Sequence, residues 1–375
     1  MSGGPPVATA VDRRPGGHNE QMPRAASASP TSTRGERLGS RSQGPRMIDV
    51  AKLAGVSQQT VSRVVNGAQN VAPEIRERVE RAIEQLRYRR NPAAAALASN
   101  RTMTIGVVSF ELAVLGPSVA LYGISEEARR HGYSTRLVTL GSLDRHAIRA
   151  ALESVGPDAV DGIIVLAPLY EAISVIQSLD IGVPMVTFEQ GTPASPTSIS
   201  IDEVRGAREA VRHLLELGHE TVWHVRGPEG WMATTARARG WAEELSAQGR
   251  VAPPAFTTAD WSAAEGHRVG RMIAGTPEVT AVFAANDPFA LGVVKALDEA
   301  GVDVPGSVSV VGFDNVKESA YYRPALTTVT LDFEEIGHTA VSRILAMIKG
   351  GADEVIPLIQ PELVVRQTTA PVRPA

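Results

Sequence analysis

VAKLAGVSQQTVSRVVNG, residues 50–67, predicts two short helices joined by a tight turn. Gly55 tolerates the backbone of such a turn, and Ser57 can cap the helix that follows it. The second helix is expected to bury its valines and to leave a polar side free. The apolar side of the two helices is expected to consist of Val50, Leu53, Ala54, Val61, Val64 and Val65.

The polar side of the second helix has side chains suited to reading DNA bases. Glutamine can hydrogen-bond N6 and N7 of adenine, and the arginine fork fits O6 and N7 of guanine. Gln58, Gln59 and Arg63 are therefore candidates for contacts in the major groove. The alternative is an ordinary helical hairpin with a solvated face. The remaining candidate DNA-binding residues of this helix are Thr60, Ser62 and Asn66.

A third helix is predicted from Pro73, a residue favoured in the first turn. Three helices with apolar stripes can close a small all-α core. The stripe of the third helix consists of Ile75, Val79, Ala82, Ile83 and Leu86.

Charge divides the chain in the same way. Between Arg46 and Arg101 there are ten Lys and Arg against five Asp and Glu, whereas residues 102–375 have 21 against 33. A basic module on an acidic body suits binding to phosphate and limits adhesion of the rest. The net charge of −4 conceals this asymmetry.

The segment before the helices has a different composition. Residues 1–45 are rich in Gly, Pro, Ser and Arg, which predicts a disordered tail. This tail either adds weak phosphate affinity or is dispensable, and Met47 offers an alternative start. No apolar run has the length of a signal peptide core or a membrane span, so we expect no membrane partner and a cytoplasmic protein, associated with the nucleoid when bound to DNA.

The segment RRNPAAAALASNR, residues 89–101, predicts one short helix. Asn91 can cap it and Pro92 can begin it. A helix of this length is marginal alone, so it can be ordered when docked and melted when free. Leu97, the one large apolar side chain among the alanines, is suited to wedging between base steps in a minor groove. A plain interdomain linker is the alternative.

The body alternates short apolar runs with amphipathic helices. This βαβ rhythm predicts an α/β body of two parallel-sheet subdomains, because about 270 residues suit two sheets better than one. The predicted strands lie in TIGVVSF (104–110), YSTRLVTL (133–140), DGIIVLAP (161–168), VPMVTFE (183–189), TVWHVRGP (221–228), TAVFAAN (280–286) and VSVVGFDN (308–315).

Ligands of open α/β sheets bind beyond the carboxyl ends of strands, and this rule selects Glu189, Asn286 and Asp314. Arg237 begins a polar helix after a strand, and Trp261 stands in a loop before another. Carboxylates, an amide, a guanidinium and an aromatic ring suit a hydroxyl-rich ligand such as a sugar. Each residue also has an ordinary alternative: a carboxylate capping a helix, a surface cation, or a core tryptophan.

Several other functions lack their motifs. A solute-binding transport protein would need an export signal and no DNA-binding head. An enzyme acting on a sugar or nucleotide would show a motif such as GxxxxGK, GxGxxG after a strand, or HExxH, and the sequence has none. The absence of cysteine excludes disulfides and thiolate metal sites. Because these catalytic motifs are missing, we expect no enzyme activity, and we expect no cofactor or metal. Structural roles are expected for His213, His219 and His224.

From about Arg46 to Pro371 the chain resembles the lac repressor (LacI/GalR) family of bacterial transcription regulators. The resemblance rests on residues 50–67, NPAAAALA, HLLELGHETVWHVRGP, ADWSA, ANDPFALG and SVSVVGFDN followed by RPALTTVTLDF. It implies a pseudo-palindromic operator, a homodimer and a periplasmic-binding-protein-like body that holds a small-molecule effector. It also implies minor-groove roles for Asn91, Ala94 and Leu97, and effector roles for Glu189, Arg237, Trp261, Asn286, Asp314 and Phe333.

The resemblance also implies a division of the chain. We expect a tail (1–45), a helix-turn-helix domain (46–90), a hinge helix and linker (91–102) and an effector-binding and dimerisation domain (103–370). The last of these is expected to contain two subdomains, about 103–201 with 332–360, and 202–330 with 361–370.

Three departures from the galactoside-binding member of the family affect these expectations. Gln58 replaces a tyrosine, which suggests a different operator preference, and Glu189 replaces an aspartate, which puts the identity of the sugar in doubt. The chain lacks the leucine-heptad tail that makes a tetramer, so a dimer is expected. The effector is expected to be a galactoside-like inducer; a nucleobase or other corepressor and a sugar-binding protein without a regulatory role are the alternatives.

Overall fold

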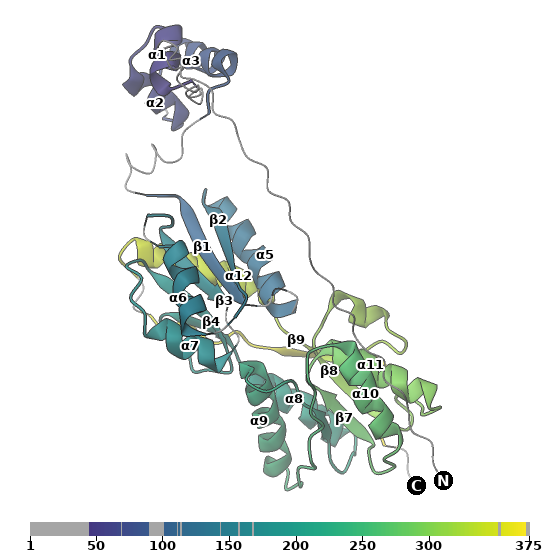
Figure 1. Ribbon diagram of the computed structural model, residues 1–375. Coiled ribbons are helices and arrows are strands. Elements are labelled where there is room, and N and C mark those ends of the chain that lie inside the picture. Colours follow the sequence, from purple (N-terminus) through teal and green to yellow (C-terminus); the bar gives the residue numbers. More distant parts are fainter. Residues whose placement is uncertain are drawn as a thin grey trace, which may run out of the picture. The chain divides into compact units, whose positions relative to one another are not determined.

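The computed structural model describes residues 45–68, 70–89, 101–110, 112, 115–142, 144–156, 158–166, 169–351 and 354–372. The chain forms two compact units, with the boundary between Arg90 and Asn91 (Figure 1). The predictions for the tail and for Asn91, Ala94 and Leu97 fall outside the described residues.

The first unit contains three helices: α1 (Met47–Ala54), α2 (Gln58–Val65) and α3 (Pro73–Leu86). The predicted turn between α1 and α2 is confirmed, since Gly55 has a left-handed φ of 64°. The predicted cap is also confirmed, because the Ser57 hydroxyl accepts a hydrogen bond from the Thr60 amide at 3.1 Å. Local sequence signals therefore determine where α2 begins.

The core of this unit differs from the expected one at Leu53. Val50, Val61 and Val79 are fully buried, as expected, but Leu53 is 47% exposed and Ala51 is buried instead. The prediction for Leu53 was wrong because α2 and α3 both pack on the side of α1 that holds Ala51. A small residue there lets three short helices approach closely.

The second unit begins with a five-stranded parallel sheet in the order β2-β1-β3-β4-β5. Four strands match the predicted apolar runs, whereas β5 was not predicted, because SISI is short and half polar. The strands are β1 (Thr104–Phe110), β2 (Ser134–Leu140), β3 (Gly162–Leu166), β4 (Met185–Gln190) and β5 (Ser198–Ile201).

Helices cover both faces of this sheet. Successive strand residues point to opposite faces, so Val107 packs in the cluster that contains residues of α5 and α12, while Val108 packs in the one that contains residues of α6 and α7. Figure 1 shows α12, late in the sequence, returning beside β3 and α5. These helices are α5 (Leu115–Arg130), α6 (Arg145–Ser154), α7 (Tyr170–Gln177) and α12 (Phe333–Ile348).

The second sheet has the order β10-β9-β8-β7-β6. It is parallel except for β10, which pairs antiparallel with β9 at one edge. The predicted α/β architecture is thus confirmed. Strands β6, β7 and β8 match predicted apolar runs, whereas β9 and the antiparallel edge strand β10 were not predicted. The strands are β6 (Trp223–Val225), β7 (Ala281–Ala284), β8 (Ser309–Asp314), β9 (Thr327–Thr330) and β10 (Glu362–Val364).

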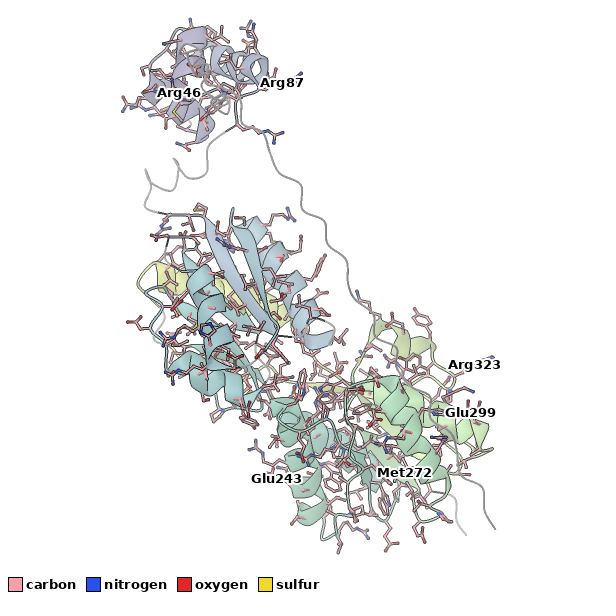
Figure 2. The ribbon with its side chains drawn as sticks, in the orientation of Figure 1. Arg46, Arg87, Glu243, Met272, Glu299 and Arg323 are labelled. Carbon is pink, nitrogen blue, oxygen red and sulfur yellow. The ribbon has the colours of Figure 1, made fainter. Side chains whose placement is uncertain are left out.

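This sheet is also covered on both faces. Phe283 packs with residues of α8 and α9, and its neighbour Val282 packs with residues of α10 and α11. Figure 2 shows Glu243, Met272 and Glu299 on the outer sides of α9, α10 and α11, away from the sheet. The elements are α8 (Glu203–Glu216), α9 (Met232–Ala247), α10 (Ala263–Ala274), α11 (Asp287–Glu299) and the 3-10 helix η1 (Lys317–Tyr321).

The two sheets share one continuous core cluster, which joins the α5 and α12 side of the first to the α8 and α9 side of the second. In addition, an antiparallel bridge links Leu169, which follows β3, to Trp231 at the start of α9. In the described part of the chain, every helix is too short or too polar to cross a lipid bilayer.

Candidate functional site

Helix α2 presents the predicted polar side chains to solvent. Gln58, Gln59 and Arg63 are exposed, so all three are free to reach outside the unit. Arg46 and Arg87 also project from this unit (Figure 2). Two candidates already make hydrogen bonds within the unit: Thr60 takes part in the Ser57 cap, and Ser62 accepts a hydrogen bond from Asn66 at 3.2 Å. The side chain of Asn66 is exposed.

The second unit contains a cavity between the two sheets. Five of the six predicted effector residues line it: Arg237, Trp261, Asn286, Asp314 and Phe333. The other lining residues are Gly116, Pro117, Gln190, Trp231 and Ala233.

A buried ion pair forms one wall of the cavity. Arg237 on α9 is 3% exposed, and its Nε and Nη2 donate to the two carboxylate oxygens of Glu203 at 2.8 and 3.3 Å. Nη1 donates to the carbonyl oxygen of Ala285. Burial opposes the charge of Arg237, but Glu203 and Asp314 outweigh it and raise the pKa of the guanidinium. The arginine is therefore held rigidly by protein groups.

Asp314 ends β8 and faces this arginine, with Oδ1 at 3.1 Å from Nη2 of Arg237. Its φ of 100° is unusual for an aspartate, and strain of this kind concentrates at functional sites. Burial raises the pKa of Asp314 to about 6, with Arg237 opposing and Glu203 reinforcing the shift. Asp314 thus places a carboxylate in the wall of the cavity, where it can accept hydrogen bonds from a ligand.

Asn286 and Trp261 are linked. The Asn286 side-chain oxygen caps α11 through the Phe289 amide at 2.8 Å, and its nitrogen donates to the Trp261 carbonyl at 3.2 Å. The Trp261 ring stacks on Phe289 and meets Trp231 edge to face, both with centroids 5.6 Å apart. Asn286 thus both caps a helix and positions the loop that carries the indole.

Glu189 lies beside the cavity rather than among its lining residues. It is 6% exposed, and its Oε1 accepts a hydrogen bond from the Thr187 hydroxyl at 2.8 Å. Alternation along β4 brings the next residue, Gln190, to the cavity instead.

Sequence reasoning missed Glu203, Gln190 and Trp231. Glu203 begins α8 directly after β5, so the rule on strand ends would have selected it if β5 had been recognised. Gln190 lies one position beyond the predicted strand, and its amide donates to Glu203 Oε1 at 2.7 Å. No pattern in the sequence singles out Trp231, because its role depends on a tertiary contact between the start of α9 and Trp261.

Gly227 makes room for the Trp261 ring. A Cβ at this position would lie 2.3 Å from Trp261 Cη2 and 2.5 Å from Thr234 Oγ1. Gly227→Ala is therefore expected to displace the ring and to lower the free energy of unfolding by about 1–3 kcal/mol. Urea unfolding and the tryptophan emission spectrum measure both effects. Gly141→Ala, where a Cβ meets open space, is the control, and an unchanged spectrum in Gly227→Ala would refute the packing argument.

Another buried carboxylate, Asp287, lies next to Asn286 at the start of α11. It is fully buried and accepts hydrogen bonds from the Thr328 hydroxyl and, at 2.8 Å, from the Val316 amide. Burial raises its pKa to about 7; the Thr328 bond opposes the shift and Asp314 reinforces it.

This shift predicts a pH dependence of stability. The pKa of Asp287 in the folded state lies above the unfolded value of about 3.9, so the folded state binds the extra proton more tightly. The protonated carboxyl therefore stabilises the fold fully below about pH 4, and this stabilisation is lost by about pH 7. Relative to Asp287→Asn, the wild type should lose on the order of 1–3 kcal/mol over this window. Urea unfolding from pH 4 to 8 measures the difference. Asp298→Asn, at an exposed aspartate, should run parallel to wild type, and a parallel Asp287→Asn curve would contradict the assignment.

The comparison with Asp287→Asn is needed because the buried histidines change the stability with pH in the opposite direction. Burial lowers the pKa of His213 and His219 and brings that of His224 to about 4. His224 stacks on Phe283 and donates from Nδ1 to the Phe283 carbonyl at 2.9 Å. The other two histidines are hydrogen-bonded to threonine hydroxyls at 3.0 Å. No group of three acidic or histidine side chains in the described ranges is placed to hold a metal ion.

Two family descriptions match the two units. Residues 46–91 match "Bacterial regulatory proteins, lacI family", and residues 211–369 match "Periplasmic binding protein-like domain". The lactose operon repressor of Escherichia coli K12 is 34% identical over 325 residues, which cover 86% of this chain and 90% of that protein. The chain belongs to the lacI family.

Other members show how far this likeness extends. The transcriptional repressor PurR of Haemophilus influenzae is 30% identical, over 85% of this chain and 97% of its own length. The crystal structure of the lac repressor dimer bound to operator and the anti-inducer ONPF has a TM-score of 0.79 at 33% identity, covering 88% of this chain and all of that one. The lacI-family fold therefore accounts for both the exposed helix α2 and the cavity.

Proposed function

We propose that this lacI-family member is a homodimeric repressor that binds a pseudo-palindromic operator and is released by a sugar. The observation that carries the proposal is the cavity in which Arg237 of α9, Asp314 of β8 and Trp261, in the loop before α10, converge. Hydrogen-bonding groups beside flat apolar rings match the hydroxyls and the C–H faces of a sugar ring. Relatives with this fold repress an operon for lactose or bind operator DNA as a dimer.

The proposed roles follow from the positions of the residues. Gln58, Gln59 and Arg63 on α2 would contact bases, and Thr60, Ser62 and Asn66 would support the helix in the groove. Asn91, Ala94 and Leu97 would enter the minor groove as a hinge helix. The cavity residues would hold the effector in a cytoplasmic protein without enzyme activity.

For a sugar to relieve repression, the sugar and the operator must weaken each other's binding to the protein. If the sugar favours the arrangement of the two sheets that splays the hinges, linkage makes the two effects equal in size. The bridge from Leu169 to Trp231 supports this coupling, because Trp231 both lines the cavity and contacts the segment between β3 of the first sheet and α7.

Fluorescence anisotropy tests the proposal. DNA from upstream of the gene is titrated with the protein, and then with galactosides, other sugars and purines. We expect high-affinity binding that a sugar reverses. A purine that tightens binding would establish a corepressor instead, and failure of every ligand with DNA affinity intact would refute the effector role.

A further inference from the structure

The guanidinium of Arg237 has little capacity left for a ligand. Nε and Nη2 engage both oxygens of Glu203, Nη2 also faces Asp314, and Nη1 donates to the Ala285 carbonyl. A guanidinium has five N–H bonds. In the described structure one N–H of Nη1 therefore remains, which is enough for a single hydroxyl but not for the two-pronged grip that binds a carboxylate or phosphate.

Glu203 is fixed in its place as the partner of Arg237. It is fully buried, and it stands in the first turn of α8, where the free amides of a helix favour a carboxylate. Gln190 donates to the same carboxylate at 2.7 Å. Rotation of Glu203 away from Arg237 would leave the Glu203 carboxylate buried without a cation, so a ligand cannot displace it without a large cost in free energy.

The wall has an excess of negative charge, since two carboxylates, Glu203 and Asp314, share one guanidinium. Asp314 is the one that lines the cavity. An anionic ligand would therefore approach a carboxylate, while Arg237, the cation among the described lining residues, is already paired. Like charges brought together in a buried site repel each other strongly.

The groups that remain open suit hydroxyls. Trp261 Nε1, buried without a partner among the described residues, needs an acceptor, and the Asp314 carboxylate, which lines the cavity, can accept a hydrogen bond from a ligand. A hydroxyl can supply both, because it donates one hydrogen bond and accepts others. The faces of Trp261 and Phe333 cover the apolar side.

We propose that Glu203 is a specificity-determining residue: by saturating Arg237 it makes the cavity select neutral, hydroxyl-bearing sugars and reject sugar acids and sugar phosphates. The inference rests on the proposed function and narrows its effector class. Glu203 acts through Arg237 and not by touching the sugar.

Calorimetric titration of the full-length protein with matched sugars tests this selectivity. The probes are galactose, galacturonate and galactose 6-phosphate, with the corresponding glucose series. We expect at least about 100-fold weaker binding of each anion than of its neutral counterpart. An anion that binds as tightly as the neutral sugar would overturn the inference. If no neutral sugar binds, the proposed sugar effector fails, and the next measurement still tests Glu203.

That measurement uses inorganic phosphate, which requires no knowledge of the sugar. We compare thermal unfolding midpoints in phosphate and in chloride at equal ionic strength. Phosphate should leave the wild type unchanged and raise the midpoint of Glu203→Gln, in which Arg237 is released. Stabilisation of the wild type that disappears in Arg237→Met, or no gain in a folded Glu203→Gln, would contradict the role of Glu203.

Asp314→Asn keeps the test decisive if Glu203→Gln does not fold. It removes the excess charge but leaves the bridge between Glu203 and Arg237 intact, so phosphate should still not stabilise it. Strong stabilisation of Asp314→Asn by phosphate would assign the rejection of anions to Asp314 and would refute the proposal.

Discussion

Arg237→Met is expected to lower the free energy of unfolding of the second unit by about 3–5 kcal/mol, because it leaves Glu203 as a buried, unpaired carboxylate. Solvent cannot compensate for this loss, because Glu203 is fully buried. In the described structure the other hydrogen bond to its carboxylate is the one from Gln190. The Ala285 carbonyl loses its donor as well. Methionine has a similar length, so the effect comes from charge and hydrogen bonding rather than from a cavity.

Urea unfolding of the single and double variants measures this coupling. Arg237→Met combined with Glu203→Gln should recover more than half of the lost stability, since the unpaired charge is gone. Arg129→Met is the control: Arg129 pairs with Glu126 at 2.7 Å but is 69% exposed, and such a pair contributes no more than about 1 kcal/mol. Equal losses for Arg237→Met and Arg129→Met would contradict the assignment.

Val61→Asp is expected to abolish operator binding while leaving the second unit folded. Val61 is fully buried at the centre of the three-helix core, and an aspartate there has no cation within that cluster. A small core cannot compensate for a buried charge. Affinity should fall by at least about 1,000-fold, the difference between specific and non-specific binding.

Anisotropy with the upstream DNA measures this loss, and the thermal unfolding of the second unit reports its integrity. Leu53→Asp adds the same charge at a site that is 47% exposed. It should fold and lose about tenfold or less, through weaker attraction to phosphate. Comparable losses in both variants would show that charge, and not the core, determines binding.

The strand-end rule predicted much of the candidate site. Asn286 and Asp314 line the cavity because each follows an apolar run that is easily recognised as a strand. Glu189 obeyed the same rule, but alternation along β4 turns its side chain toward Thr187, and the exact end of a strand decides which neighbour reaches a cavity.

Glu203 was missed for a different reason. The strand before it is SISI, which is too short and polar to be recognised without its neighbours. β5 pairs with β4 and packs Ile199 and Ile201 into the core, and these contacts stabilise it as a strand. Leu53 likewise lies outside the core because of where α2 and α3 pack, which periodicity within α1 does not specify.

The sequence by itself determined the Gly55 turn, the Ser57 cap, the polar face of α2 and the alternation of helices with the strongly apolar strands. These are local properties, set by backbone preferences and by the spacing of apolar residues. Only the tertiary structure decided that Glu203 occupies Arg237, that Gln190 and not Glu189 reaches the cavity, and that Trp231 meets Trp261. Such contacts join residues distant in the chain, and burial between two sheets gives them their strength.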